Sequence, residues 1–167
     1  MKNNELIFAK VKPNAIIPTK REEDAGYDIF SCFEEDYIVI HPNTTKLIPT
    51  GIATAFSKDY YAQIQERGST GSKGIKYGAG VIDSGYRNEW FVPITNCNYE
   101  ILIIAKDVKQ AENLYPFAKK IIYPYEKAIA QFVVLPVPKM ETKEIPYEEL
   151  LEIKSERGLG ALGSSGK

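Results

Sequence analysis

One aspartate, Asp83, lies in an apolar turn within the stretch AGVIDSGYRNEWFVPI (79–94), with an aromatic residue three positions further on. A carboxylate in such a turn can accept a proton from water and act as a general base. The chain has a single histidine, His41 in IVIHPNTT, with no partner motif around it. Serine–histidine or cysteine–histidine catalysis would depend on that residue alone, and a solvated turn histidine is the simpler interpretation. Any catalysis is therefore expected to use carboxylates, a metal ion and water.

Two glycine-rich loops carry hydroxyl and cationic side chains, namely ERGSTGSKG (66–74) and RGLGALGSSGK (157–167). Backbone N–H groups in such loops can converge on an anion, and an arginine adds a forked, charge-assisted contact. Each loop alone is also typical of a mobile surface loop. Together they suit a polyphosphate. Two further polar residues stand out: Asp28 in DAGYDIFS (24–31) and Gln131 in the apolar run KAIAQFVV (127–134). Each also has a structural interpretation, as a turn cap or as a partner for backbone groups.

Short strands must position these residues. Runs rich in β-branched and aromatic residues, separated by Pro, Gly and Asn, predict strands at 6–11, 37–42, 47–56, 60–66, 90–95, 100–106 and 128–137. Helix is expected only in 109–120, interrupted by Pro116, and as a turn in 146–154. The spacing of the runs predicts an all-β sandwich or barrel. We expect a single β domain over 1–156, followed by a flexible glycine-rich tail over 157–167.

The balance of charge and the cysteine spacing argue against several classes of protein. The 21 basic and 22 acidic residues lack the cationic excess of a nucleic-acid surface, so no nucleic-acid partner is expected. Cys32 and Cys97 have neither disulfide-framework nor zinc spacing, which favours a reducing cytoplasmic location. The N-terminus lacks a signal-peptide apolar region, and runs such as ILIIA are too short to span a bilayer. We therefore expect a cytoplasmic protein with no membrane contact.

Five stretches, read in order, resemble the five motifs of the homotrimeric dUTPase family. They are AGYDIFS (25–31), RGSTGSKG (67–74), GVIDSGYR (80–87), AIAQ (128–131) and RGLGALGSSG (157–166). The third is the most specific, and the resemblance runs from residue 5 to the C-terminus. It implies a jelly-roll-like homotrimer with active sites at subunit interfaces and magnesium as cofactor. It also implies hydrolysis of dUTP to dUMP and pyrophosphate, which limits uracil in DNA and supplies dUMP for dTMP synthesis.

The resemblance further implies roles for individual residues. Asp83 would orient and activate the attacking water, while Tyr86 would pack against the deoxyribose and leave no room for a 2′-hydroxyl. Asp28 would hold hydrated magnesium through water. Backbone groups from Tyr77 to Val81, including those of Gly78 and Gly80, would pair with uracil. The phosphates and the uracil would also be contacted by Arg67, Gly68, Ser69, Gln131, Arg157, Leu162, Gly163, Ser164 and Ser165.

The sequence departs from the family pattern at several places, three of which bear on the site or on a partner. Gly68 follows Arg67 where the family has serine, so the phosphate contact could come from Gly68 or Ser69. Leu162 replaces an aromatic residue that covers the uracil, and 106–124 has the character of an insertion. Two alternatives stay open. One is a dUTPase-like regulator that binds a protein through 106–124, with or without catalysis. The other is a dCTP deaminase of the same fold, although no segment matches its catalytic glutamate.

Overall fold

A computed structural model of the chain describes residues 4–78 and 80–160. Contacts divide the chain into two units, Met1–Val137 and Pro138–Lys167, which we describe separately. The first unit carries the strands, which are β1 (Leu6–Lys10), β2 (Tyr27–Ile29), β3 (Tyr37–Ile40), β4 (Thr45–Pro49), β5 (Ile52–Phe56), β6 (Tyr60–Gln65), β7 (Ile75–Tyr77), β8 (Val81–Ile82), β9 (Phe91–Asn96), β10 (Ile101–Ala105), β11 (Lys120–Pro124) and β12 (Ala130–Pro136). It also carries two short helices, α1 (Gly68–Gly71) and α2 (Val108–Glu112).

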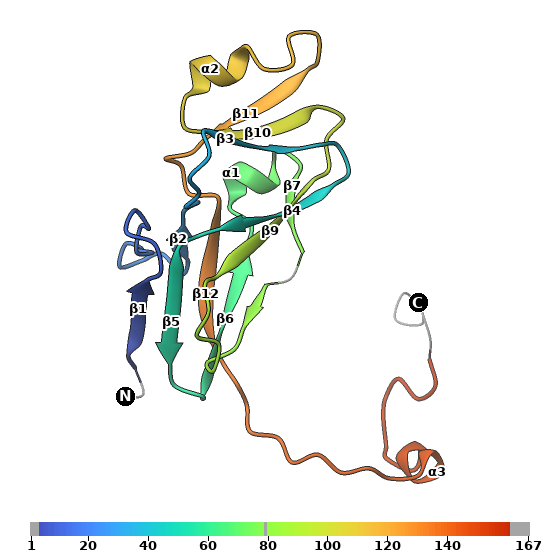
Figure 1. The fold of residues 1–167 in the computed structure, drawn as a ribbon. Coiled ribbons are helices and arrows are strands. Elements are labelled where there is room, and N and C mark those ends of the chain that lie inside the picture. The colour runs from blue at the N-terminus through green and yellow to red at the C-terminus, as the bar shows by residue number, and fades with distance from the viewer. Residues whose placement is uncertain (1–3, 79, 161–167) are drawn as a thin grey trace. The chain divides into compact units, whose positions relative to one another are not determined.

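The strands form four small sheets (Figure 1), with the orders β1-β5, β11-β10-β3, β2-β12-β6-β8 and β4-β9-β7. The pairings among the described strands are antiparallel, except that β10 and β11 run parallel. The longest pairing joins β6 to β12, from Gln65 opposite Gln131 to Tyr60 opposite Pro136. This pairing places the C-terminal end of β6 beside the N-terminal end of β12. The motif RGSTGSKG (67–74) begins just after the first of these ends, and the motif AIAQ (128–131) lies at the second.

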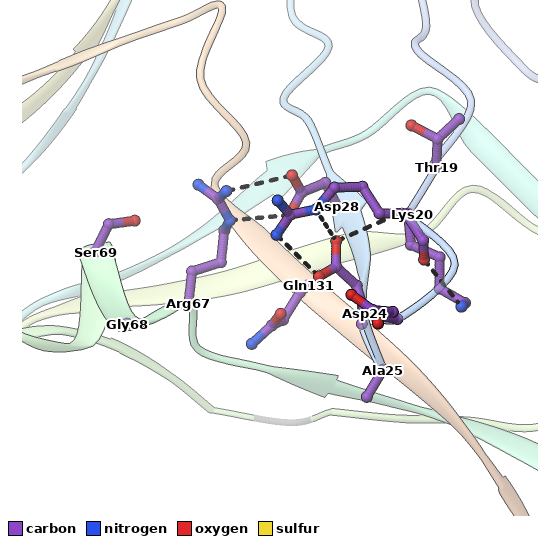
Figure 2. Close-up of a pocket in the computed structure, with 12 residues that line it drawn as sticks. Thr19, Lys20, Asp24, Ala25, Asp28, Arg67, Gly68, Ser69 and Gln131 are labelled. Atoms are coloured by element: carbon purple, nitrogen blue, oxygen red, sulfur yellow. Dashed lines mark hydrogen bonds and ion pairs between the residues drawn. The ribbon is translucent and has the colours of Figure 1, made fainter.

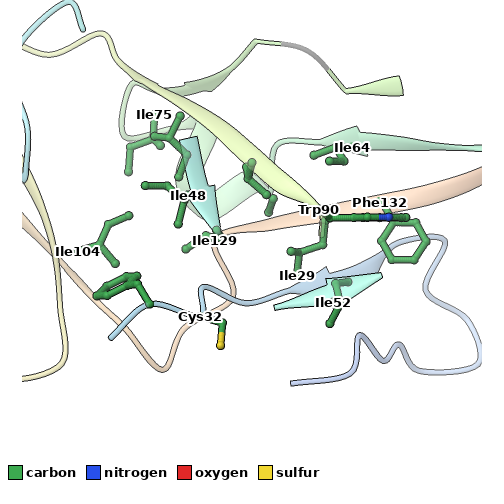
Figure 3. Packing of buried hydrophobic residues seen from close by; sticks show 14 of the residues in the cluster. Ile29, Cys32, Ile48, Ile52, Ile64, Ile75, Trp90, Ile104, Ile129 and Phe132 are labelled. Carbon is green, nitrogen blue, oxygen red and sulfur yellow. The ribbon is translucent and has the colours of Figure 1, made fainter. Parts of the chain in front are cut away.

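One hydrophobic core lies between the sheets, and all four sheets contribute buried side chains to it. Its largest members include Trp90 and Phe132, both with no exposed surface, which pack edge to face with ring centres 5.1 Å apart (Figure 3). The Tyr27 ring stacks on the Phe132 ring, with ring centres 5.0 Å apart and an interplanar angle of 14°. Sheets that surround a shared core in this way confirm the predicted all-β, jelly-roll-like class.

Strand β10 explains the uninterrupted apolar run ILIIA, because both of its faces are buried. Leu102 and Ile104 belong to the main core, whereas Ile103 and Ala105 form a second cluster with Ala111 of α2. The segment that resembles an insertion, 106–124, therefore supplies α2 and β11, which cover the second face and extend the edge of this sheet. A strand buried on both faces is expected to be apolar throughout.

Two predicted elements were wrong in extent. The helix expected over 109–120 ends at Glu112. The Lys120 amine caps its end by donating to the carbonyls of Glu112 and Leu114. Strand β11 begins at Lys120, within the span expected to be helical. The strand expected over 47–56 is two strands, β4 and β5, separated at Gly51, whose φ is +69°. A Cβ at Gly51 would lie 2.8 Å from the Ala15 Cβ, so both the backbone angle and the packing require glycine.

The second unit contains a short helix, α3 (Tyr147–Leu151), where a turn was expected over 146–154. Its acidic residues Glu148 and Glu149 lie in the first turn, where they suit the helix dipole. In the described part of the chain, no helix is both long enough and apolar enough to cross a membrane.

Candidate active site

A polar cleft of about 900 Å³ opens where β2, β12 and α1 meet. Figure 2 shows Asp28 and Gln131 at its centre, the loop that carries Thr19 and Asp24 on one side, and Arg67, Gly68 and Ser69 on the other. The loop is closed by a hydrogen bond from the Asp28 N–H to the Thr19 carbonyl, at 3.0 Å. The cleft thus brings together five of the predicted site residues, from three separate motifs.

Arg67 and Asp28 form a forked ion pair in this cleft. The Arg67 Nε lies 2.9 Å from Asp28 Oδ1, and Nη2 lies 3.2 Å from Oδ2. A third contact, from Nη1 to the Ala128 carbonyl at 3.2 Å, ties the guanidinium to the segment before β12. Both side chains are half-buried, at 30% and 38% exposed. The pair holds a cation and a carboxylate in fixed positions that solvent and a small anion can still reach.

The orientation of Arg67 is set by α1, which it precedes as the N-cap residue. The Arg67 N–H donates to the Thr70 hydroxyl at 3.2 Å, and that hydroxyl donates to the Arg67 carbonyl at 3.0 Å. Thr70 is buried, whereas Gly68 and Ser69 are exposed and line the cleft. A Cβ built on Gly68 meets nothing within 4 Å. Both Gly68 and Ser69 therefore have access to a ligand, and the choice between them stays open.

Gln131 occupies the floor of the cleft, directly opposite Asp28 in the β2–β12 ladder. Its amide donates from Nε2 to the Glu66 carbonyl at 2.8 Å, which fixes the side chain. A Cβ on Gly26 would lie 2.5 Å from Gln131 Oε1, so a larger residue at position 26 would displace the amide. The glycine of the AGYD stretch is thereby explained by close packing.

Two tyrosines, Tyr77 and Tyr123, hold parts of this site in place through hydrogen bonds. The sequence alone did not assign this role to either of them. Burial raises the pKa of Tyr77 to about 12, and its hydroxyl contacts the Thr70 hydroxyl at 3.0 Å and the Ile129 carbonyl. Tyr123, on β11, is buried beneath the Arg67 loop and donates to the Ala128 carbonyl at 2.7 Å. Burial raises the pKa of Tyr123, although the nearby Arg67 charge acts in the opposite direction. For Tyr123 the only signal in the sequence was a tyrosine inside an apolar run, which is more often a core residue.

Asp83 lies directly after β8, in the turn that leads to β9. Its carbonyl accepts the Tyr86 N–H at 3.0 Å, which closes the turn. The Asp83 side chain is exposed, and its carboxylate has no hydrogen bond or ion pair with any described residue. The Tyr86 hydroxyl donates to the Glu89 carbonyl at 3.0 Å, so the ring is held against its own turn. This geometry leaves the carboxylate available to water.

Arg87 and Glu89 stabilise the same turn, and neither was predicted to do so. The Arg87 Nη1 donates to the Ser84 carbonyl within the turn and to the Thr54 carbonyl on β5, the latter at 3.3 Å. The Glu89 carboxylate accepts the Gly51 N–H at 2.7 Å and lies 3.5 Å from the Lys12 amine. The contacts to Thr54, Gly51 and Lys12 join residues distant in sequence, so no local pattern indicates them.

The segment predicted to recognise uracil runs from β7 to β8. The Gly78 N–H donates to the Pro93 carbonyl at 3.1 Å, and the Gly80 carbonyl accepts the Ile64 N–H at 2.7 Å. A Cβ on Gly80 would lie 2.8 Å from the Ile64 carbonyl oxygen, so the backbone approach of the two segments requires glycine. Tyr77 and Val81 occupy the flanking strands, at the ends nearest this segment.

The described lining of the cleft does not include Asp83, Tyr86 or the uracil segment. Of the predicted residues, those that line the cleft are Asp28, Arg67, Gly68, Ser69 and Gln131. In the second unit, the Arg157 Nε donates to the Gly160 carbonyl at 3.0 Å. The remaining predicted residues, Leu162, Gly163, Ser164 and Ser165, lie outside the described residues.

Comparison with known sequences identifies the family. The family model named dUTPase matches residues 12–115. The deoxyuridine 5′-triphosphate nucleotidohydrolase of Nautilia profundicola is 35% identical to this chain over 167 residues, and the alignment covers 98% of the chain and 99% of the relative. The enzyme of the same name from Clostridium kluyveri is 33% identical, with coverage of 97% and 98%.

Solved structures agree with the sequence comparisons. The Staphylococcus bacteriophage 80alpha dUTPase, solved with dUPNHPP, has a TM-score of 0.74 at 28% identity, and the match covers 98% of this chain and 99% of that one. EIAV dUTPase has a TM-score of 0.62 at 21% identity, which supports the fold alone. Because the family model matches more than half of the residues and the relatives align from end to end, the chain belongs to the dUTPase family.

Proposed function

We propose that this dUTPase-family enzyme hydrolyses dUTP to dUMP and pyrophosphate, by attack of a water molecule on the α-phosphorus. The observation that carries the proposal is the polar cleft around Asp28, Arg67 and Gln131, in a chain related to dUTPases from end to end. The product dUMP feeds dTMP synthesis, and the removal of dUTP limits uracil in DNA. Both cysteines of the described chain are free, which suits the reducing cytoplasm.

Asp83 acts as the general base in this mechanism. Its exposed carboxylate accepts a proton from the attacking water, which gains nucleophilicity as it does so. Tyr86, fixed by its hydrogen bond to the Glu89 carbonyl, packs against the deoxyribose and excludes a 2′-hydroxyl. Backbone groups of Tyr77, Gly78, Gly80 and Val81 read the polar edge of uracil. Cytosine presents a donor where uracil presents an acceptor, so the fixed backbone rejects it.

Magnesium fits the phosphate side of the site. The Asp28 carboxylate lies in a cleft lined by oxygen and nitrogen groups, and magnesium favours oxygen ligands while it keeps several waters. Asp28 would hold the ion through water, since no cluster of three His, Cys, Asp or Glu side chains among the described residues offers a direct site. A magnesium ion held there would neutralise charge on the phosphates. Arg67, Gln131 and either Gly68 or Ser69 bind the phosphate oxygens directly.

We further propose that the functional unit is a homotrimer, because Asp83, Tyr86 and the uracil segment do not line the cleft of their own chain. The Asp83 turn of one chain then completes the cleft of another, and closed cyclic symmetry makes the three sites equivalent. Exposed apolar side chains on the outer face of the β4–β9 sheet, Leu47 and Phe91, support such an assembly, as does Val81 on β8. In the same assembly, the tail 157–167 closes over the site, with Arg157, Gly163, Ser164 and Ser165 on the phosphates and Leu162 over the uracil.

Sedimentation equilibrium tests the assembly. We expect a mass three times the 18.8 kDa of one chain, together with activity that falls when dilution dissociates the particle. An active monomer of 18.8 kDa would contradict the proposal that two chains build each site.

Turnover of a nucleotide panel tests the proposed substrate. The purified protein is incubated with magnesium and with dUTP, dCTP, dTTP or UTP, and pyrophosphate release is measured, with a chelator as control. We expect efficient turnover of dUTP alone, with dCTP slower by about 10⁴–10⁵-fold because its buried polar groups would be mismatched. Ammonia release from dCTP would instead identify a deaminase, and equal turnover of dTTP and UTP would exclude the proposed specificity.

A further inference from the structure

A second arginine–aspartate pair lines the cleft, in the loop before β2, and none of the predicted roles involves it. The Arg21 guanidinium donates to the Asp24 carboxylate through Nε at 2.8 Å and through Nη2 at 3.0 Å. The hydrogen bonds from Arg21 lower the pKa of the Asp24 carboxyl. The same contact raises the pKa of Arg21, and the charge of Asp28 contributes to that rise. The Arg21 side chain is 87% exposed. Arg21 is therefore a permanent cation that interacts with the Asp24 and Asp28 carboxylates and remains open to a ligand.

The neighbouring residue, Lys20, adds a second cation to the same side of the cleft (Figure 2). Its amine lies 5.6 Å from the centre of the Tyr27 ring. It also donates to the backbone carbonyls of Arg21 and Glu22, at the long distances of 3.3 and 3.4 Å. Within residues 4–78 and 80–160, Lys20 forms no ion pair. Weak contacts to neutral groups leave its charge available to an anion.

The charges of the cleft lining determine how it can bind an anion. Its described lining contains three cations, Lys20, Arg21 and Arg67, and three carboxylates, those of Glu23, Asp24 and Asp28. The two arginines are each engaged by an aspartate. A nucleoside triphosphate with one magnesium ion still carries an excess of negative charge, which a neutral lining does not attract. A phosphate offers an arginine the same forked geometry as a carboxylate does, so either arginine can exchange its Arg–Asp contact for an Arg–phosphate contact.

We propose that Lys20 and Arg21 bind the β- and γ-phosphates of the nucleotide, on the side of the cleft across from Arg67, and hold the departing pyrophosphate. The nucleotide itself is taken from the proposed function. The recognition chemistry, however, is that of a condensed phosphate, and inorganic pyrophosphate suffices to probe it. Because both side chains project from a surface loop, their replacement should leave the core unchanged.

Calorimetric titrations with magnesium pyrophosphate and with dUMP test the proposal. The variants are Lys20→Gln, Arg21→Gln and the double variant, with Lys109→Gln on α2 as a matched control for the loss of one exposed lysine. We expect each single variant to weaken pyrophosphate binding about tenfold and the double variant to weaken it further. The affinity for dUMP, which has only an α-phosphate, should stay at the wild-type value in all of them.

Two results would overturn the proposal: wild-type pyrophosphate affinity in the double variant, or a loss of dUMP affinity equal to the loss for pyrophosphate. The titrations require no turnover. If the wild-type protein binds pyrophosphate through Lys20 and Arg21 but does not hydrolyse dUTP, the proposed substrate is wrong. The proposed pyrophosphate-binding role of Lys20 and Arg21 would still hold.

Discussion

Asp83→Asn is expected to lower kcat for dUTP by about 10²–10⁴-fold, because an amide cannot accept a proton from the attacking water. Asparagine has nearly the same shape as aspartate, and the carbonyl that closes the turn onto the Tyr86 N–H belongs to the backbone. Substrate binding should therefore persist. Single-turnover kinetics would separate the chemical step from binding, and calorimetry with a non-hydrolysable dUTP analogue would measure the affinity directly.

Asp36→Asn is a suitable control, because Asp36 is exposed and lies outside the described lining of the cleft. It removes one surface carboxylate and should leave kcat at the wild-type value. A near-normal kcat in Asp83→Asn would remove Asp83 from the mechanism. A loss of analogue binding equal to the loss of kcat would assign it to substrate binding instead.

Deletion of residues 157–167 is expected to leave a folded protein of unchanged oligomeric state, with turnover reduced by about 10²-fold or more. Ordering a glycine-rich segment costs backbone entropy of roughly 1–2 kcal/mol per residue. A polyphosphate, gripped by Arg157, Ser164 and Ser165, can offset that cost, and closure then excludes water and aligns the α-phosphate. Because Leu162 replaces an aromatic residue, closure should depend more on the phosphates than on the base.

Arg157→Gln in the full-length chain is the companion variant, since it removes one phosphate contact and keeps the rest of the tail. It should show a smaller loss than the deletion. Sedimentation and thermal unfolding at equal protein concentration would establish that both proteins are intact. Wild-type turnover in the truncated protein would disprove a role for the tail as a lid.

The parts of the fold that follow from local sequence were predictable. In β6, alternation buries Ala62 and Ile64 and leaves Gln65 exposed, as a strand with one covered face requires. By contrast, β11 was missed because it depends on a parallel pairing with β10 and on the burial of Tyr123, both of which are tertiary. The break at Gly51 was missed for the same reason: its neighbours, such as Ala15, are distant in sequence.

In the candidate site, too, the residues could be predicted from the sequence but their contacts could not. Asp28, Arg67 and Gln131 were indicated by their motifs, and the structure places them in one cleft. Their mutual contacts were not predictable, because an ion pair between β2 and the start of α1 depends on how two separate strands align. The supports of the Asp83 turn, Arg87 and Glu89, have ordinary surface character in the sequence and gain their roles only from distant backbone partners.

Hydrolysis of dUTP in ¹⁸O-enriched water tests the central claim most directly, because the isotope marks the phosphorus atom that water attacks. Under single-turnover conditions with magnesium, mass spectrometry would follow the label in both products. Attack on the α-phosphorus predicts one ¹⁸O atom in dUMP and none in pyrophosphate. Label in pyrophosphate, or release of orthophosphate with dUDP, would contradict the mechanism proposed for Asp83 and the cleft.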